Sequence, residues 1–259
     1  MKKLIAMLLA LSMVLAFAGC AKTETAPETT EAVETEAVVE TTEAVETEAA
    51  ETEAAEEVTV MTHEEFMAAE LESVVTVETY VQGHQSWWDN KITVYCQSED
   101  GAYFLYELAC SEEDAAKLVP GTKIRVTGDK AEWAGEVEIM NGTFEFVEGE
   151  SYVAEALDVT ELLGTDELAA HQNEFVAFTG MTVEAIQYKN DEPGDDIYVT
   201  LCYNGASYDF CVEFYLTGAE SDVYTTVGTL NVGDVVNVEG YLYWYEGVNP
   251  HITAISVAE

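Results

Sequence analysis

PGTKIRVTG at residues 120–128 and GDVVNVEG at residues 233–240 are the stretches that decide the fold of this chain. In each stretch a turn glycine is followed by alternating apolar and polar residues, which is the pattern of a half-buried β-strand. The glycines that open the two stretches are 112 residues apart, and so are the glycines that close them, Gly128 and Gly240. We therefore predict that the chain contains one fold twice.

The first copy contains five segments with strand character and one with helix character. Ser111 is the N-cap of the helical segment 111–118, and Asp114 is at about the position of the capping-box acid. Pro120-Gly121 ends the helix. The predicted strands cover residues 75–81, 92–96, 102–108 and 123–128, with a fifth that opens at 136–139.

The second copy repeats this order. Asn204-Gly205 stands between two of its strands and is the strongest short-range signal for a β-hairpin. An irregular connection replaces the helix of the first copy. The predicted strands cover residues 176–183, 197–202, 208–214 and 233–240.

Five strands with a helix between the third and the fourth follow the order of an OB-fold, a small Greek-key barrel. We predict an all-β chain of two consecutive OB-fold-like five-stranded barrels, at residues 58–157 and 158–259. Short lead-in helices are expected at residues 62–70 and 158–170. A β-sandwich is the alternative architecture.

Three stretches of the first copy also resemble a known group of proteins. GAYFLYEL at 101–108, PGTKIRVTG at 120–128 and AEWAGEVEI at 131–139 are similar to the OB-type modules of uncharacterised lipoproteins from Gram-positive gut bacteria. The resemblance covers most of residues 62–148 and, more loosely, residues 158–257. It implies the fold and a surface location, and it implies no established ligand.

The N-terminus has the pattern of a signal peptide, with two lysines ahead of an apolar run at residues 4–18. A membrane-spanning helix needs about 20 apolar residues, so we predict cleavage, with residues 1–19 as the leader. FAGC at 17–20 resembles a lipobox, which implies that Cys20 carries two acyl chains and anchors the protein stably to the outer face of the cytoplasmic membrane. An ordinary secretory signal is the alternative.

Residues 20–57 are predicted to form a disordered stalk behind the anchor. Residues 21–57 contain 13 Glu, 9 Thr and 9 Ala, with no glycine and no aromatic residue. Such a segment buries too little apolar surface to offset its chain entropy, and its charges keep it extended.

The composition argues against nucleic acid and against catalysis. With 51 acidic and 9 basic residues the chain has a formal charge of −42, which repels phosphate backbones. Lys123 and Arg125 share a strand face and are expected to pair with nearby glutamates. The four histidines are scattered and no nucleophile or phosphate-binding motif occurs, so we expect no enzyme activity, no cofactor and no metal site. The acidic loop at 190–196 lacks EF-hand spacing and is interpreted as a solvated turn.

Four cysteines follow Cys20 in an exported chain. Cys96 shares a strand face with apolar residues and is expected to be a buried thiol that is not bonded to Cys110. Cys202 and Cys211 are expected to face outward, and a disulfide between them is left open.

Aromatic residues mark the expected ligand site. OB-folds bind through the face of strands two and three and through the loops that join strands one to two and four to five. All four tryptophans fall in such loops, where their rings offer a large apolar surface with a polar handle. The candidate ligand-binding residues are Trp87, Trp88, Tyr103, Trp133, Tyr188, Tyr243, Trp244 and Tyr245. The alternative is that these rings plug the barrels or form the contact between them.

The sequence thus predicts a non-catalytic surface lipoprotein that binds a carbohydrate, a peptide or a protein. A structural or assembly component of the envelope is the alternative function, and nucleic-acid binding is the least favoured.

Overall fold

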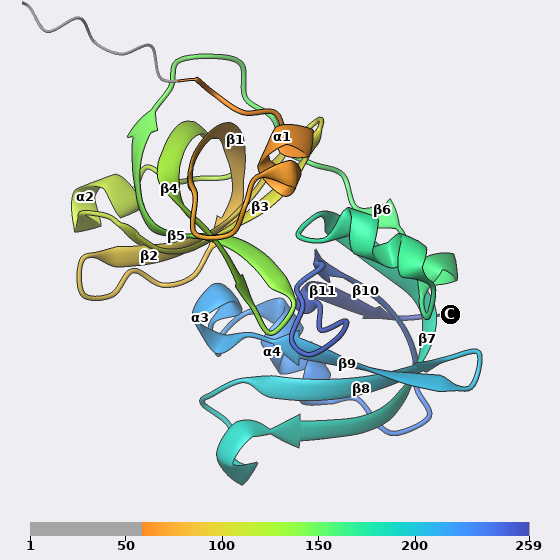
Figure 1. The fold of residues 1–259 in the computed structure, drawn as a ribbon. Helices are drawn as coiled ribbons and strands as arrows, with labels where there is room; N and C mark the ends of the chain where they lie inside the picture. Colours follow the sequence, from red (N-terminus) through yellow and green to blue (C-terminus); the bar gives the residue numbers. More distant parts are fainter. Residues whose placement is uncertain (1–58, 259) are drawn as a thin grey trace, which may run out of the picture. The chain divides into compact units, whose positions relative to one another are not determined.

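The computed structural model describes residues 59–258, which belong to one compact unit (Figure 1). The predicted leader, Cys20 and the stalk lie outside the described residues. Within residues 59–258, no helix has both the length and the apolar character that a membrane crossing requires.

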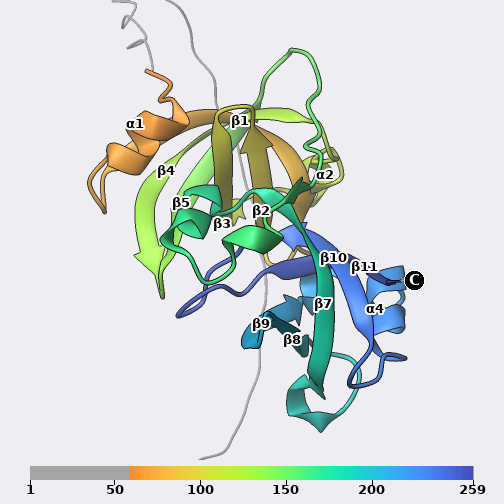
Figure 2. The same ribbon diagram turned by 90° about the vertical axis from the view of Figure 1, so that its right-hand side faces the viewer.

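Five strands of the first half form a closed barrel, which we call barrel 1 (Figures 1 and 2). Its strand order is β1-β2-β3-β5-β4, with antiparallel pairing of β1 to β4 and parallel pairing of β3 to β5. The strands are β1 (Val74–His84), β2 (Lys91–Ser98), β3 (Gly101–Ala109), β4 (Lys123–Trp133) and β5 (Glu136–Phe146).

Barrel 1 has two short helices, and the second begins at the predicted cap, Ser111. Thr62 closes a capping box with Glu65 at the start of α1 (His63–Ala68). The Ser111 hydroxyl accepts a hydrogen bond from the Asp114 amide at the start of α2 (Glu112–Ala115). Helix α2 is shorter than the predicted segment because the chain passes into turns before Pro120-Gly121.

The second half forms barrel 2 with the same strand order. The series β10-β11-β9-β8-β7 is joined at its two ends by pairing of β10 to β7. The strands are β7 (Phe175–Tyr188), β8 (Ile197–Tyr203), β9 (Ala206–Val212), β10 (Val235–Tyr241) and β11 (His251–Val257), and the two-residue β6 (Leu157–Asp158) pairs in parallel with β7. The predicted all-β fold of two OB-fold-like barrels is therefore confirmed.

The connections of barrel 2 differ from the prediction in three places. The lead-in at 158–170 is not one helix but β6 and two 3-10 helices, η1 (Thr160–Leu162) and η2 (Asp166–His171), because Gly164 takes a left-handed φ of 79° between them. The irregular connection contains α3 (Phe214–Thr217) and α4 (Asp222–Val227), and η3 (Lys189–Asp191) follows β7. Strand β9 ends at Val212 because the Glu213 side chain caps α3.

The repeated glycines occupy the same turn in both barrels. The Gly121 amide donates to the Val81 carbonyl over 2.8 Å, and the Gly233 amide donates to the Val183 carbonyl over 2.8 Å. Both opening glycines take a left-handed φ, 89° and 97°, which favours glycine. The 112-residue spacing thus corresponds to one local structure formed twice.

Each barrel encloses its own hydrophobic core. Cys96 lies in the core of barrel 1 as a buried thiol, which confirms that prediction, and Cys96 and Cys110 are both free in the structure. Cys202 is half-buried and free. Cys211 points out of the core of barrel 2, as predicted, but its side chain is buried rather than exposed to solvent, because it lies near Tyr95 of barrel 1.

Candidate ligand-binding site

Barrel 2 covers much of the outer face of β2 and β3, the face through which OB-folds usually bind. Tyr95 of β2 and Phe104 of β3 point out of barrel 1, yet they are only 1% and 4% exposed. The ring of Tyr95 stacks on Tyr241 of barrel 2 with centroids 4.4 Å apart. Its hydroxyl is hydrogen-bonded to His251 Nδ1 over 2.6 Å, and burial lowers the pKa of His251 to about 3.

Polar groups complete this contact between the barrels. The Phe175 amide donates to Gln97 Oε1 over 2.7 Å, and the Trp244 amide donates to Glu136 Oε2 over 2.9 Å. The Gln172 side-chain amide donates to the Gly135 carbonyl over 2.8 Å. Backbone groups of both barrels therefore find partners across the contact.

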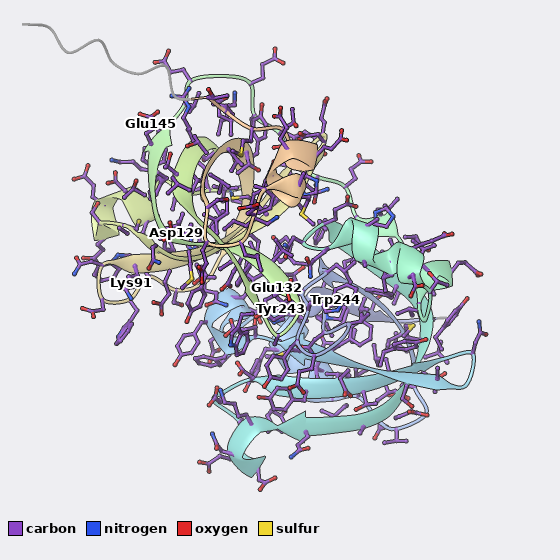
Figure 3. The ribbon with its side chains drawn as sticks, in the orientation of Figure 1. Lys91, Asp129, Glu132, Glu145, Tyr243 and Trp244 are labelled. Carbon is purple, nitrogen blue, oxygen red and sulfur yellow. The ribbon has the colours of Figure 1, made fainter. Side chains whose placement is uncertain are left out.

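Tyr243 and Trp244 belong to this contact (Figure 3). The Tyr243 ring lies edge-on to Phe104, with centroids 5.1 Å apart, and stacks on His251. Trp244 packs against the core of barrel 2. The alternative considered from the sequence, that aromatics form the contact between the domains, describes these two residues.

Tyr103 and Tyr188 do not join an open site. Tyr103 is 2% exposed and packs on Phe66 inside barrel 1. Strand alternation turns Tyr103 inward and its neighbours outward, so assigning it to a ligand face is wrong. Tyr188 is half-buried and packs against the core of barrel 2 beside Tyr224.

The end of the β2–β3 face that barrel 2 leaves open forms a pocket of about 340 Å³. Side chains from the loop before β2, from both strands and from α3 line it. They are Gln85, Ser86, Trp88, Lys91, Ile92, Thr93, Tyr106, Glu107 and Tyr215. Of the predicted aromatics, only Trp88 is among these lining residues.

A tight turn orients Trp88. Trp88 and Lys91 exchange two backbone hydrogen bonds of 3.1 and 2.9 Å, and both central residues, Asp89 and Asn90, have positive φ, as in a type I′ hairpin turn. Trp87 anchors the turn to the end of β3, because its indole N–H donates to the Cys110 carbonyl over 2.8 Å. Trp88 is consequently left 71% exposed.

A β-bulge directs the next two lining side chains. The pairing of β2 with β3 shifts between Ile92 and Val94, and Glu107 opposite takes a φ of 48°. Bulges commonly re-aim side chains at functional sites. Here Tyr106 is left 39% exposed, and the Glu107 carboxylate pairs with Lys91 Nζ over 2.6 Å.

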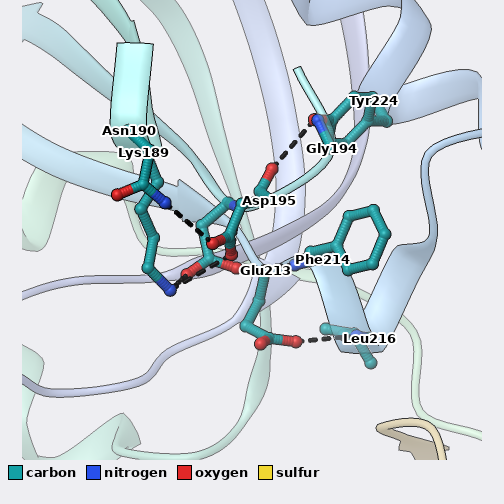
Figure 4. Close-up of polar contacts among 9 residues, drawn as sticks. Lys189, Asn190, Gly194, Asp195, Glu213, Phe214, Leu216 and Tyr224 are labelled. Carbon is teal, nitrogen blue, oxygen red and sulfur yellow. Dashed lines mark hydrogen bonds and ion pairs between the residues drawn. The ribbon is translucent and has the colours of Figure 1, made fainter. Parts of the chain in front are cut away.

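Barrel 2 supplies the last wall through α3. The Tyr215 carbonyl accepts hydrogen bonds from the Ser86 amide (2.7 Å) and hydroxyl (3.2 Å), while its ring is 56% exposed. Glu213 caps α3 by accepting from the Leu216 amide, and burial raises the pKa of Glu213 to about 7 (Figure 4). No signal in the sequence pointed to Tyr215, because it joins the pocket only when the barrels pack.

Trp133 and Tyr245 form a separate exposed pair. Their ring centroids are 5.2 Å apart, and their side chains are 54% and 49% exposed. The Glu246 amide donates to the Ala134 carbonyl over 2.8 Å, which joins the β4–β5 turn to the loop after β10. This pair lies outside the pocket.

The basic side chains of residues 59–258 are all engaged. Lys123 and Arg125 pair with Glu78, as predicted, and Arg125 also pairs with Glu145. Lys189 lies between Asp195 and Asp196 of the acidic loop (Figure 4). The other three are Lys91 on Glu107, Lys117 on Glu113 and Asp114, and Lys130 on the carbonyls of Met67 and Ala69. The described residues contain no cluster of metal-ligating side chains.

Comparisons with known proteins return only distant structural likenesses. No protein-family model matches the chain, and no curated protein matches it in sequence. The similar structures include a murine DNA-binding protein bound to double-stranded DNA, with 11% identity over 71% of this chain and 96% of that chain and a TM-score of 0.37. Another is the Ifi202 HINa domain in complex with 20-bp double-stranded DNA (11% identity, 71% and 98% covered, TM-score 0.34). At such scores the strand order, rather than these likenesses, carries the fold assignment.

We expect Trp87 and Trp88 to differ sharply in their contribution to folding. Trp87→Ala removes a packed ring and its bond to Cys110, and should cost about 3 kcal/mol of unfolding free energy, since the ring is only partly buried. Trp88→Ala should change it by less than about 0.5 kcal/mol. Urea unfolding followed by far-UV circular dichroism measures both. Equal losses in the two variants would contradict this description of the turn.

Proposed function

We propose that this protein is a non-catalytic lipoprotein of the outer face of the cytoplasmic membrane that binds an uncharged carbohydrate in the pocket of Trp88, Tyr106 and Tyr215. One observation carries the proposal. Three exposed aromatic rings from three separate elements surround one pocket, and its only charged side chains, Lys91 and Glu107, neutralise each other.

The pocket suits a ligand with apolar faces and many hydroxyl groups. Its volume of about 340 Å³ falls in the usual range for small-molecule sites. Aromatic rings stack on the apolar faces of sugar rings, and the amide of Gln85, the hydroxyl of Thr93 and the Lys91–Glu107 pair offer both donors and acceptors. A peptide or a protein surface is the other ligand class that such rings anchor.

Charge makes nucleic acid the less favoured ligand. Phosphate binding rests on Lys and Arg that displace counterions, and the basic groups of the described residues already have acidic or carbonyl partners. The pocket itself contains one lysine, whose pKa is raised by its hydrogen bond to Glu107.

A structural or assembly role is the second candidate, and the Trp133–Tyr245 pair favours it. Two exposed rings held together by a backbone bond are suited to a contact with an envelope partner. Loss of partner binding in Trp133→Ala, with the pocket intact, would distinguish this role.

The membrane anchor is tested at Cys20. Cys20→Ser should release the protein from the membrane fraction, because the sulfur that would carry the acyl chain is gone. Fractionation and labelling with palmitate measure this. A variant that still sediments with membranes and takes up label would show that the anchor lies elsewhere.

Carbohydrate binding is tested with a panel of neutral oligosaccharides and the mature protein in a calorimeter. Trp88→Ala should weaken any oligosaccharide that binds by about 2 kcal/mol, roughly thirtyfold in Kd. Trp133→Ala is the matched control, an exposed tryptophan outside the pocket, and should leave Kd unchanged. No binding by any oligosaccharide, or equal losses in both variants, would overturn the proposal.

A further inference from the structure

Glu136 occupies an unusual place in the contact between the barrels. It opens β5 of barrel 1, and its side chain is fully buried. Oε2 accepts the hydrogen bond from the Trp244 amide of barrel 2 over 2.9 Å. Oε1 has no partner, and it is the only buried side-chain polar atom of the described residues left in that state.

The surroundings of Glu136 favour a neutral carboxyl group. Burial is the main cause that raises its pKa, to about 8, and the nearby carboxyl of Glu138 adds to the rise. The Asn173 side-chain amide and the Trp244 amide act in the opposite sense. Tyr243 also faces this group, and none of the six basic side chains pairs with it. An unpaired charge buried here would be costly.

We propose that Glu136 is a positioning residue whose neutral carboxyl group holds barrel 2 on barrel 1 and thereby keeps Tyr215 in the wall of the pocket. Loss of a proton from Glu136 places an uncompensated charge inside the contact. Separation of the barrels would return that charge to water, so ionisation shifts the equilibrium towards the undocked state.

The geometry connects Glu136 to the pocket through one continuous contact. This contact includes the Glu136–Trp244 hydrogen bond, the ring pair of Phe104 and Tyr243, and the Tyr95–His251 hydrogen bond. It ends at the bond between the Ser86 amide and the Tyr215 carbonyl. Because each barrel has its own core, the barrels separate as bodies, and weaker docking at one end lowers occupancy of the closed pocket at the other.

The direction of the pH effect follows from linkage. An exposed glutamate has a pKa near its ordinary value of 4.5, and the docked Glu136 has a pKa of about 8. The contribution of Glu136 to docking is therefore fully present below pH 4.5 and falls about tenfold per pH unit until pH 8. His251 of the same contact has the opposite effect. Because burial lowers its pKa from 6.5 to about 3, protonation of His251 weakens docking as the pH falls through that range. Glu213, with a pKa of about 7, titrates in the same pH range as Glu136. A variant is therefore needed to isolate the contribution of Glu136 to the pH dependence of docking.

Hydrogen exchange of three backbone amides, in the mature protein between pH 6.5 and 8, tests the inference without any ligand. Trp244 reports the bond to Glu136, Ser86 reports the pocket wall, and Val81, bonded to Thr122 within barrel 1, reports opening of that barrel. After correction for intrinsic exchange, protection at Trp244 and Ser86 should fall with pH. Glu136→Gln keeps an acceptor for the Trp244 amide and cannot ionise. In this variant the part of the fall in protection that comes from Glu136, about tenfold per pH unit, should be absent. Val81 should not change in either protein.

Glu138→Gln is the comparison variant, because Glu138 is a buried carboxyl on the same strand with a raised pKa. Its carboxyl is the smallest of the causes that act on the pKa of Glu136, so protection at Ser86 should still fall with pH in this variant. Unchanged protection at Ser86 across this range, or wild-type pH dependence in Glu136→Gln, would overturn the inference. If Glu136→Gln does not fold, Ser86 is compared with Val81 in Glu213→Gln, which removes the other carboxyl that titrates in this window; protection at Ser86 that no longer falls with pH in that variant would overturn the inference. The inference rests on the barrel contact alone, so its failure would leave carbohydrate binding at the pocket standing.

Discussion

The rest of the structure depends on the burial of Tyr95 and Phe104 on the outside of barrel 1. Rings of this size bury about 150 to 250 Å² each, and on an isolated barrel both would face water. Barrel 2 covers them with Tyr241, Tyr243 and His251. The face that an OB-fold commonly offers to a ligand is here mostly an internal contact.

The pocket is what this contact leaves open. Trp88 and Tyr106 project from barrel 1 because a tight turn and a β-bulge direct them, and Tyr215 arrives with α3 of barrel 2. A strongly acidic chain would repel anions from such a site, and the Lys91–Glu107 pair gives the pocket itself no net charge. The proposed ligand class therefore rests on charge and ring exposure rather than on the fold.

Local signals in the sequence predicted the local structure. The repeated glycines predicted one turn in both barrels, and Ser111 predicted a helix start. Trp88, predicted to lie in an exposed loop, is the one predicted aromatic that lines the pocket. Residues whose surroundings depend on packing between distant segments were not predictable in this way. The exposure or burial of Tyr215, Cys211 and Glu136 depends on the other barrel or on a neighbouring segment. Tyr103 was assigned to the wrong face of its strand, since its side chain points into barrel 1.

The central claim, that barrel 2 covers Tyr95 and Phe104 on the β2–β3 face of barrel 1, is tested most directly by titration of His251 with NMR. If the contact is closed, the imidazole is buried against Tyr95 and its pKa is lowered to about 3. Its ring resonances should then stay constant between pH 5 and 8 and report a neutral imidazole throughout. A titration centred near 6.5, the value of a solvated histidine, would show that the face is open to water and would contradict the account.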